Sequence, residues 1–129
     1  MNATQNDTRL FDHLSEWAKL CPDECRIVRK SGSLAFFSLG FTVIEVVQKF
    51  DPIEDQKIMA IVLGAVLTAI AKKGISCQIT VNGDRAFVTV NHYTCLEFGN
   101  IFSSPVNEVS IALLTAYLAY LQSKQLCIS

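Results

Sequence analysis

Apolar residues near the start of the chain recur at steps of three and four positions, which is the spacing of one helix face. These positions hold Leu10, Phe11, Leu14, Trp17, Ala18 and Cys21. The opposite face carries Asp12, His13, Glu16 and Lys19. Asp7 or Thr8 is suited to cap the first turn, and Pro22 ends the pattern. The pattern predicts an amphipathic helix that ends before Pro22.

The next part of the chain is predicted to form strands. Segments 26–29 and 34–39 flank Gly32, and a glycine at that place permits a tight reversal. Segment 41–50 is ambiguous, because its apolar residues fit helical spacing while many of them are β-branched, which favours a strand. We expect a strand there, because a strong helix start follows immediately.

That helix start is the stretch Asp51-Pro52-Ile53-Glu54. Asp51 is placed to cap the helix, proline suits the first helical position, and Glu54 can bond back to the cap. Lys72 and Lys73 suit the negative end of the helix dipole, and Gly74 is a typical closing residue. We therefore predict a helix from about residue 51 to residue 72 or 73.

A hairpin and a last helix complete the pattern. Segments 75–81 and 85–90 flank Asn82-Gly83-Asp84, in which Asn-Gly tolerates the left-handed backbone of a hairpin turn. A further strand is expected over 93–98 and a loop over 99–105. Ser104 is expected to cap a final helix that has Pro105 in its first turn and runs from Val106 to about Lys124. No repeat or linker interrupts the chain, so we predict a single domain over 1–129.

Together these elements predict an α+β fold. We expect an antiparallel β-sheet with hairpins, on which two long apolar helices and an N-terminal helix pack in an α/β/α sandwich-like arrangement. The chain is long enough to bury a core without disulfides or metals.

The two long helices carry very little polar surface. Residues 58–71 include no charged side chain, and the polar side chains in 109–121 are only serine, threonine and tyrosine hydroxyls. A helix that lies on one sheet needs an apolar stripe of about 100°, and these helices are apolar nearly all round. We therefore expect self-association, most simply as a two-fold dimer. The contact is predicted to use Met59, Val62, Val66, Leu113, Tyr117 and Tyr120. The alternative is that the first helix and the loops complete the cover within one chain.

Charge and composition narrow the classes of partner. Only 18% of the residues are charged and the formal net charge is -1, without the stripe of Lys and Arg typical of nucleic-acid binding. The longest apolar run is shorter than the ~20 residues needed to span a bilayer. The polar start of the chain and an odd number of cysteines predict a cytoplasmic protein with reduced thiols. We expect neither nucleic acid nor a membrane as partner.

Residues able to carry chemistry are few. His13 and His92 are the only histidines and no CxxC pair occurs, so neither a metal site nor a cofactor is expected. His92, Cys95 and Glu97 lie close in sequence and resemble a thiol–imidazole–carboxylate arrangement, although such groups usually converge from distant segments. A buried structural cysteine near a surface histidine is the favoured interpretation, and we predict no catalytic site.

The order of the elements resembles the phage ABA sandwich family of small phage and prophage proteins. The similar residues are the Phe50-Asp51-Pro52 stretch opening the long helix, its end at Lys73-Gly74, the hairpin 75–90, and Ser104-Pro105 with 111–116 in the closing helix. The likeness covers about residues 50–122, and segment 22–49 departs from the family's pattern. The resemblance implies helices packed on an antiparallel sheet, and it implies no reaction and no catalytic residue.

Three functions follow as hypotheses. The first is a non-enzymatic phage-type accessory protein that binds a host protein, for instance as an anti-defence inhibitor. The second is a sponge for a nucleotide signal, and the third is a small enzyme that uses Cys95 with His92. The residues expected to contact a ligand or partner are Arg26, Arg29, Arg85, His92 and Tyr93.

Overall fold

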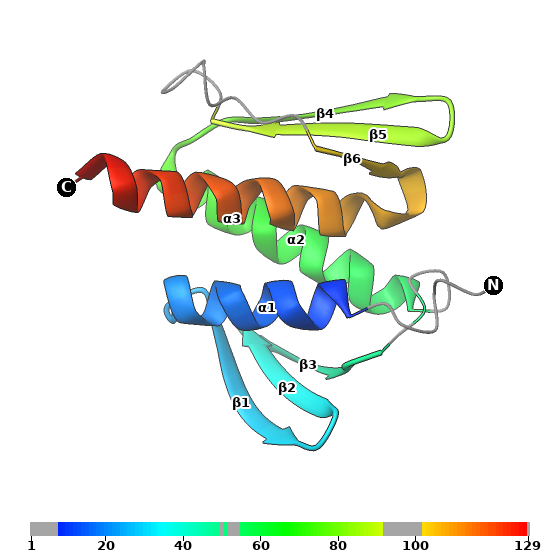
Figure 1. Ribbon diagram of the computed structural model, residues 1–129, viewed down its shortest axis with the longest axis vertical. Helices are drawn as coiled ribbons and strands as arrows, with labels where there is room; N and C mark the ends of the chain where they lie inside the picture. The colour runs from blue at the N-terminus through cyan, green and yellow to red at the C-terminus, as the bar shows by residue number, and fades with distance from the viewer. Residues whose placement is uncertain (1–7, 50, 52–54, 92–101, 129) are drawn as a thin grey trace.

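The structure is a computed structural model that describes residues 8–49, 51, 55–91 and 102–128 (Figure 1). The helices are α1 (Arg9–Leu20), α2 (Gln56–Lys73) and α3 (Val109–Ile128). The strands are β1 (Cys25–Ser31), β2 (Leu34–Leu39), β3 (Thr42–Val47), β4 (Cys77–Asn82), β5 (Arg85–Val90) and β6 (Phe102–Pro105). A 3-10 turn, η3 (Val106–Glu108), precedes α3. The predicted α+β class is confirmed.

The strands form two sheets rather than the single sheet expected. Sheet A has the order β1-β2-β3 and sheet B the order β4-β5-β6, and all neighbours pair antiparallel. Figure 1 shows the helices between the two sheets, so the layer order is β/α/β and the expected α/β/α order is wrong. The reason is that α2 intervenes between the two hairpin units, and each unit covers a different side of the helices.

Each hairpin in the two sheets has a two-residue turn, and the first residue of that turn is glycine. Gly32, Gly40 and Gly83 each occupy the first turn position with a positive φ of 60° to 66°. A glycine adopts this backbone without the steric cost that a Cβ would add. The predicted hairpins at Gly32 and Gly83 are therefore confirmed, and so is a strand within segment 41–50.

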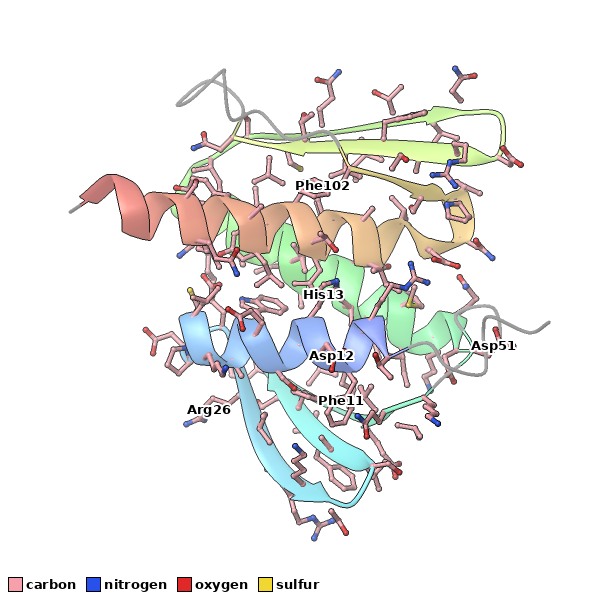
Figure 2. All side chains as sticks on the ribbon, in the orientation of Figure 1. Phe11, Asp12, His13, Arg26, Asp51 and Phe102 are labelled. Atoms are coloured by element: carbon pink, nitrogen blue, oxygen red, sulfur yellow. The ribbon has the colours of Figure 1, made fainter. Side chains whose placement is uncertain are left out.

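Sheet A packs on α1 through its inner face. Phe37 meets the ring of Phe11 edge-on at a centroid distance of 5.9 Å, and the ammonium of Lys30 lies 5.6 Å from the centroid of the same ring. Phe11 lies between α1 and sheet A, whereas Phe102 lies between sheet B and α3 (Figure 2). The helical layer is thus covered from both sides.

Helix α3 is enclosed by its neighbours. It packs against α1 and α2 on one side and against β5 and β6 on the other. Its buried residues lie on nearly all sides of the helix, and they are Ser110, Ile111, Ala112, Leu113, Leu114, Ala116, Tyr117, Leu118 and Leu121. The second sheet therefore covers an apolar circumference that one sheet would have left in water.

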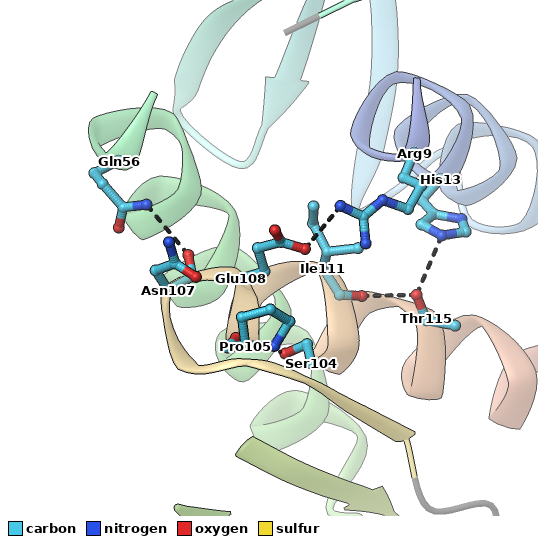
Figure 3. Close-up of polar contacts among 9 residues, drawn as sticks. All are labelled: Arg9, His13, Gln56, Ser104, Pro105, Asn107, Glu108, Ile111 and Thr115. Atoms are coloured by element: carbon cyan, nitrogen blue, oxygen red, sulfur yellow. Dashed lines mark hydrogen bonds and ion pairs between the residues drawn. The ribbon is translucent and has the colours of Figure 1, made fainter. Parts of the chain in front are cut away.

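Polar contacts fix the ends of the helices against one another (Figure 3). Arg9 forms an ion pair with Glu108 at 2.7 Å, which joins the start of α1 to the turn before α3. The Thr115 hydroxyl lies 3.1 Å from the Nε2 atom of His13, and it also donates to the carbonyl of Ile111. These contacts set the register between α1 and α3.

Two predicted boundaries are wrong near α3. Residues 102–105 were expected in a loop, but they form β6 and pair with β5. Ser104 was expected to cap the helix, yet it is buried in β6 and its hydroxyl donates to the carbonyl of Pro105. Helix α3 consequently begins at Val109, after η3, and runs beyond Lys124 to Ile128.

The ends of α2 agree only in part with the prediction. Gly74 closes the helix with a left-handed φ of 69°, as expected. At the other end the helix begins at Gln56, so Asp51 is not its cap, and the side chain of Asp55 at the cap position makes no capping hydrogen bond. The predicted strand 93–98 and the stretch 52–54 lie outside the described residues.

Candidate functional site

A groove runs between α2 and the turn that joins β2 to β3. Its volume is about 490 Å³. It is lined by Asp23, Glu24, Leu39, Gly40, Phe41, Thr42, Ala60, Ile61, Gly64, Ala65, Thr68, Ala69 and Lys72. The volume falls in the range of about 300–1,000 Å³ that is usual for binding sites. We call this feature the α2 groove.

The helix wall of the α2 groove is formed mainly by small side chains, with Ile61 and Lys72 as the larger members. Ala60, Gly64 and Thr68 follow one another at four-residue spacing, which places them on one side of α2. The hydroxyl of Thr68 donates to the carbonyl of Gly64 at 2.9 Å, so its hydrogen is already used within the helix. A Cβ built on Gly64 would meet nothing within 4 Å. This wall is therefore open to a large side chain from outside.

The opposite wall carries a fully exposed phenylalanine. Phe41 follows Gly40 in the tight β2–β3 turn, and its side chain is completely accessible to solvent. Turns of this kind favour small polar residues, and nothing in the fold needs an aromatic ring there. An exposed ring at the rim of a groove is instead typical of a surface that contacts a partner.

One end of the α2 groove is lined by charged residues of both signs. Asp23 and Glu24 lie in the turn between α1 and β1, and Lys72 lies on the α2 wall. Glu24 is largely engaged within the protein. One of its oxygens accepts hydrogen bonds from the indole of Trp17 at 2.9 Å and from the hydroxyl of Tyr117 at 2.8 Å. The other oxygen forms an ion pair with Lys73 at 3.1 Å.

These contacts control the charge of the Glu24 carboxyl. Burial by itself would raise its pKa, but the hydrogen bonds from Trp17, Tyr117 and Lys73 outweigh burial, so the pKa lies below its ordinary value. Burial would lower the pKa of Lys73, but the hydrogen bond and the charge of Glu24 raise it. Both groups are therefore ionised at neutral pH.

Glu24 and its three partners Trp17, Tyr117 and Lys73 form a group that we call the Glu24 cluster, and it joins all three helices. The ring of Trp17 on α1 meets the ring of Tyr117 on α3 edge-on, with centroids 6.0 Å apart, and Lys73 is the last residue of α2. Burial and the neighbouring carboxylate raise the pKa of Tyr117 above its ordinary value. Because Trp17 and Tyr117 are fully buried, we assign the cluster a structural role.

The described thiols are poor nucleophiles. Burial raises the pKa of Cys25 to about 12, and it also raises the pKa of Cys21 and Cys77. At Cys21 the negative charge of Glu24 adds to this effect. A thiol reacts as its thiolate, so these side chains offer little reactivity at neutral pH.

A smaller polar depression adjoins the charged end of the groove. It has a volume of about 220 Å³ and is lined by Pro22, Asp23, Glu24, Cys25, Arg26, Ser38 and Gly40. Arg26 brings a positive charge close to the two carboxylates. The end of the α2 groove therefore has mixed charge rather than a uniform acidic field.

The predicted ligand residues do not converge. Arg26 and Arg29 lie on β1 in sheet A, and Arg29 stacks over the ring of Phe36 at 4.7 Å. Arg85 lies on β5 in sheet B, on the other side of the helical layer, and donates to the hydroxyl of Ser103 at 2.7 Å. These three cannot bind one anion in a single chain. His92 and Tyr93, like Cys95 and Glu97, lie outside the described residues.

The predicted self-association residues lie mostly inside the chain. Met59, Val62 and Val66 face the core from α2, and Leu113 and Tyr117 are fully buried in α3. Tyr120 is partly buried and stacks on Tyr117 at a centroid distance of 6.4 Å. The five buried side chains cannot contact another folded copy, because α2 and α3 pack on each other and α1 and sheet B cover α3.

The residues of the α2 groove were not singled out from the sequence as a site. The sequence pattern predicted Phe41 only as the start of a strand and assigned no role to Asp23 and Glu24. A usable signal was present at Phe41, because Gly40-Phe41 separates two strand-like segments and so places an aromatic residue in a tight turn. No comparable signal tied Asp23 to α2, since their proximity depends on tertiary packing.

Searches for related proteins return no match to a family model, to a curated protein or to a solved structure. Within the described residues, no three His, Cys, Asp or Glu side chains gather in a way that could hold a metal ion. In the same part of the chain, no helix has the length and apolar character required to cross a membrane.

Proposed function

We propose that this protein acts by binding another protein in the α2 groove, and that it performs no chemistry of its own. The observation that carries the proposal is the fully exposed ring of Phe41 beside an open groove walled by small residues. Exposed aromatic rings often anchor protein interfaces by filling an apolar pocket on the partner. A phage-type accessory protein that binds a host protein is the setting implied by the resemblance described above.

The shape of the α2 groove favours a particular kind of partner segment. Its long wall is apolar and small, which suits a helix or extended segment with large apolar side chains. Its end has mixed charge, because Lys72 and the Glu24–Lys73 pair lie beside Asp23, so charge sets no preference for a basic or an acidic residue. We propose a partner segment with large apolar anchors.

The test compares two groove variants with a matched surface control. Phe41→Ser removes the exposed ring, and Gly64→Leu fills the groove without meeting a neighbouring atom at Cβ. Val28→Ser is the control, because Val28 is 58% exposed on β1 and does not line the groove. Partners captured on the immobilised protein are purified, and their affinity for each variant is measured by calorimetry.

We expect both groove variants to weaken binding by at least about tenfold, which corresponds to about 1.4 kcal/mol. The control is expected to bind like the unchanged protein. A purified partner that binds Phe41→Ser and Gly64→Leu with unchanged affinity would contradict the proposal. Urea unfolding of each variant establishes that a loss of binding does not come from a loss of folding.

A further inference from the structure

The outer strands of the two sheets differ in how well their edges are protected. β1 carries Arg26, Arg29 and Lys30, and its register shifts between Ile27 and Arg29, as in a β-bulge. β3 has Glu45 near its middle, and β6 is only four residues long and ends in Pro105. Charges, bulges, prolines and short length are the devices by which proteins prevent pairing at sheet edges.

β4 has none of these devices. Its sequence is Cys77-Gln78-Ile79-Thr80-Val81-Asn82, with no charged residue and no proline. Its register with β5 is regular over all six residues. Among the described strands, β4 pairs only with β5, so its other edge presents main-chain groups that can accept another strand.

The hairpin geometry tells which residues of β4 face that free edge. Asn82 and Arg85 close a two-residue turn, so they exchange hydrogen bonds with each other, and the bonding alternates along the strand from there. The N–H of Asn91 donates to the carbonyl of Ser76, which agrees with this alternation. The main-chain groups of Ile79 and Val81 therefore point away from β5, toward the free edge.

The helix-facing side of β4 is also left uncovered. Ile79 and Val81 stand opposite Val88 and Ala86, which are fully buried over α3. Yet Ile79 is 37% exposed and Val81 is 57% exposed. The cause is that α3 packs under β5 and β6, and β4 extends beyond it. A strand with uncovered apolar side chains and a free edge is expected to gain from pairing.

We propose that β4 pairs antiparallel with β4 of a second copy of this chain, about a two-fold axis at Thr80. Sheet B and its copy then form one continuous sheet. Ile79 stands opposite the partner's Val81, and the two exchange both main-chain hydrogen bonds. On the outer face Thr80 stands opposite the partner's Thr80, and Gln78 opposite the partner's Asn82. Apolar residues thus meet apolar ones, and polar residues meet polar ones.

A second copy is the occupant favoured by this complementarity. In a two-fold arrangement the same strand must supply both halves of the contact, and the alternation of β4 meets that condition on both faces. This inference is independent of the α2 groove, because Phe41 belongs to sheet A and β4 to sheet B, on opposite sides of the helical layer (Figure 1). Variants of one surface therefore leave the other intact.

The first test is a disulfide at the two-fold axis. Thr80→Cys places a thiol opposite its own copy, at the Cβ separation of about 4.5–5.5 Å found between directly opposed residues, which a small adjustment can bridge. Gln78→Cys is the control, since in this register its own copy lies about four residues away along the strand, or about 13 Å. We expect mild oxidation to give a covalent dimer for Thr80→Cys and none above the unchanged protein's background for Gln78→Cys.

The second test is the oligomeric state in solution. Val81→Lys puts a charge on the pairing edge at a position that is already half exposed, so the monomer fold is expected to persist. At about 0.1 mM, sedimentation is expected to show a dimer for the unchanged protein and a monomer for Val81→Lys. Circular dichroism establishes that the variant is folded.

A monomeric unchanged protein without the Thr80→Cys crosslink overturns the proposal. So does a dimer that survives in the folded Val81→Lys variant. If the unchanged protein is monomeric and Val81→Lys instead abolishes binding of a different protein, the edge accepts a foreign strand, and the two-fold pairing is equally overturned.

Discussion

Helices α2 and α3 are similarly apolar in sequence and very differently placed in the fold. α3 packs against two helices on one side and sheet B on the other, so its buried residues lie on nearly all sides of the helix. α2 buries Met59, Val62, Val66, Ala69 and Ile70, all on one face, and its other face is open to solvent and to the α2 groove. Two helices of similar apolar composition therefore differ in burial: α3 lies within the core, and one face of α2 lies on the surface.

The difference teaches that an apolar helix sequence predicts that the helix surface will be buried. The sequence does not say which element or partner buries it. For α3 the cover is a hairpin unit of the same chain. For the outer face of α2 no described element supplies it, and that is why we propose a partner there. Four substitutions test this contrast between the helices, and they follow in order of expected effect.

The largest effect is expected from truncating the enclosed helix. Leu114→Ala removes a fully buried side chain from α3 and should lower the free energy of unfolding by about 2–5 kcal/mol. Leu67→Ala makes the same chemical change on the outer side of α2, where the side chain is 38% exposed, and should cost less than about 1 kcal/mol. Urea unfolding measures both, and equal losses would mean that the two helices are equally enclosed.

A smaller effect is expected at the contact that links both helices. Glu24→Gln keeps the shape of the side chain but removes the charge that Lys73 of α2 pairs with and that Tyr117 of α3 donates to. We expect a loss of about 1–3 kcal/mol at neutral pH. Water cannot compensate for the weakened hydrogen bonds, because the Tyr117 and Trp17 donors are buried.

This loss should depend on pH in a defined direction. The pKa of Glu24 is lower in the folded state than its ordinary value of 4.5. Its charge therefore stabilises the fold above that ordinary value, and the stabilisation disappears as the pH falls through the folded-state pKa. The gap between the unchanged protein and Glu24→Gln should shrink on acidification, and a gap that stays constant to pH 3 would show that the carboxylate charge plays no part.

The smallest effect has the opposite sign. Gly64→Ala in the middle of α2 should raise the free energy of unfolding by about 0.5–1 kcal/mol, because alanine favours the helix and its Cβ meets no neighbour. The same methyl group enters the α2 groove. We therefore expect a variant that folds more stably and binds its partner less tightly, as measured by urea unfolding and calorimetry. Tighter binding would show that the groove wall is not a contact.

Local signals predicted most elements correctly. The spacing of Leu10, Phe11, Leu14 and Trp17 located α1, Gly74 marked the end of α2, and Gly83 marked the β4–β5 hairpin. β6 was missed because Phe102–Pro105 is short and contains Pro105 and two serines, which are typical of loops. The segment forms a strand because it pairs with β5, and its own sequence does not favour a strand.

The arrangement of the elements was harder to predict. Nothing in the sequence says that the hairpins before and after α2 form separate sheets, since strand pairing depends on which helix face each hairpin covers. The predicted dimer residues followed from assuming a single sheet, and five of them are buried because α2 and α3 pack on each other and α1 and sheet B cover α3. The α2 groove depends on the same tertiary arrangement, so only Phe41 carried a local signal.

The Glu24 cluster also equips the protein with an optical reporter. Trp17 is the only tryptophan of the chain, and its indole is fully buried against Tyr117 and bonded to a carboxylate. Its emission should shift to longer wavelength when the junction of the three helices opens and the ring meets water. Fraying of β4 or β6, far from that junction, should leave the spectrum unchanged. Fluorescence compared with circular dichroism would therefore separate melting of the helical layer from melting of sheet B.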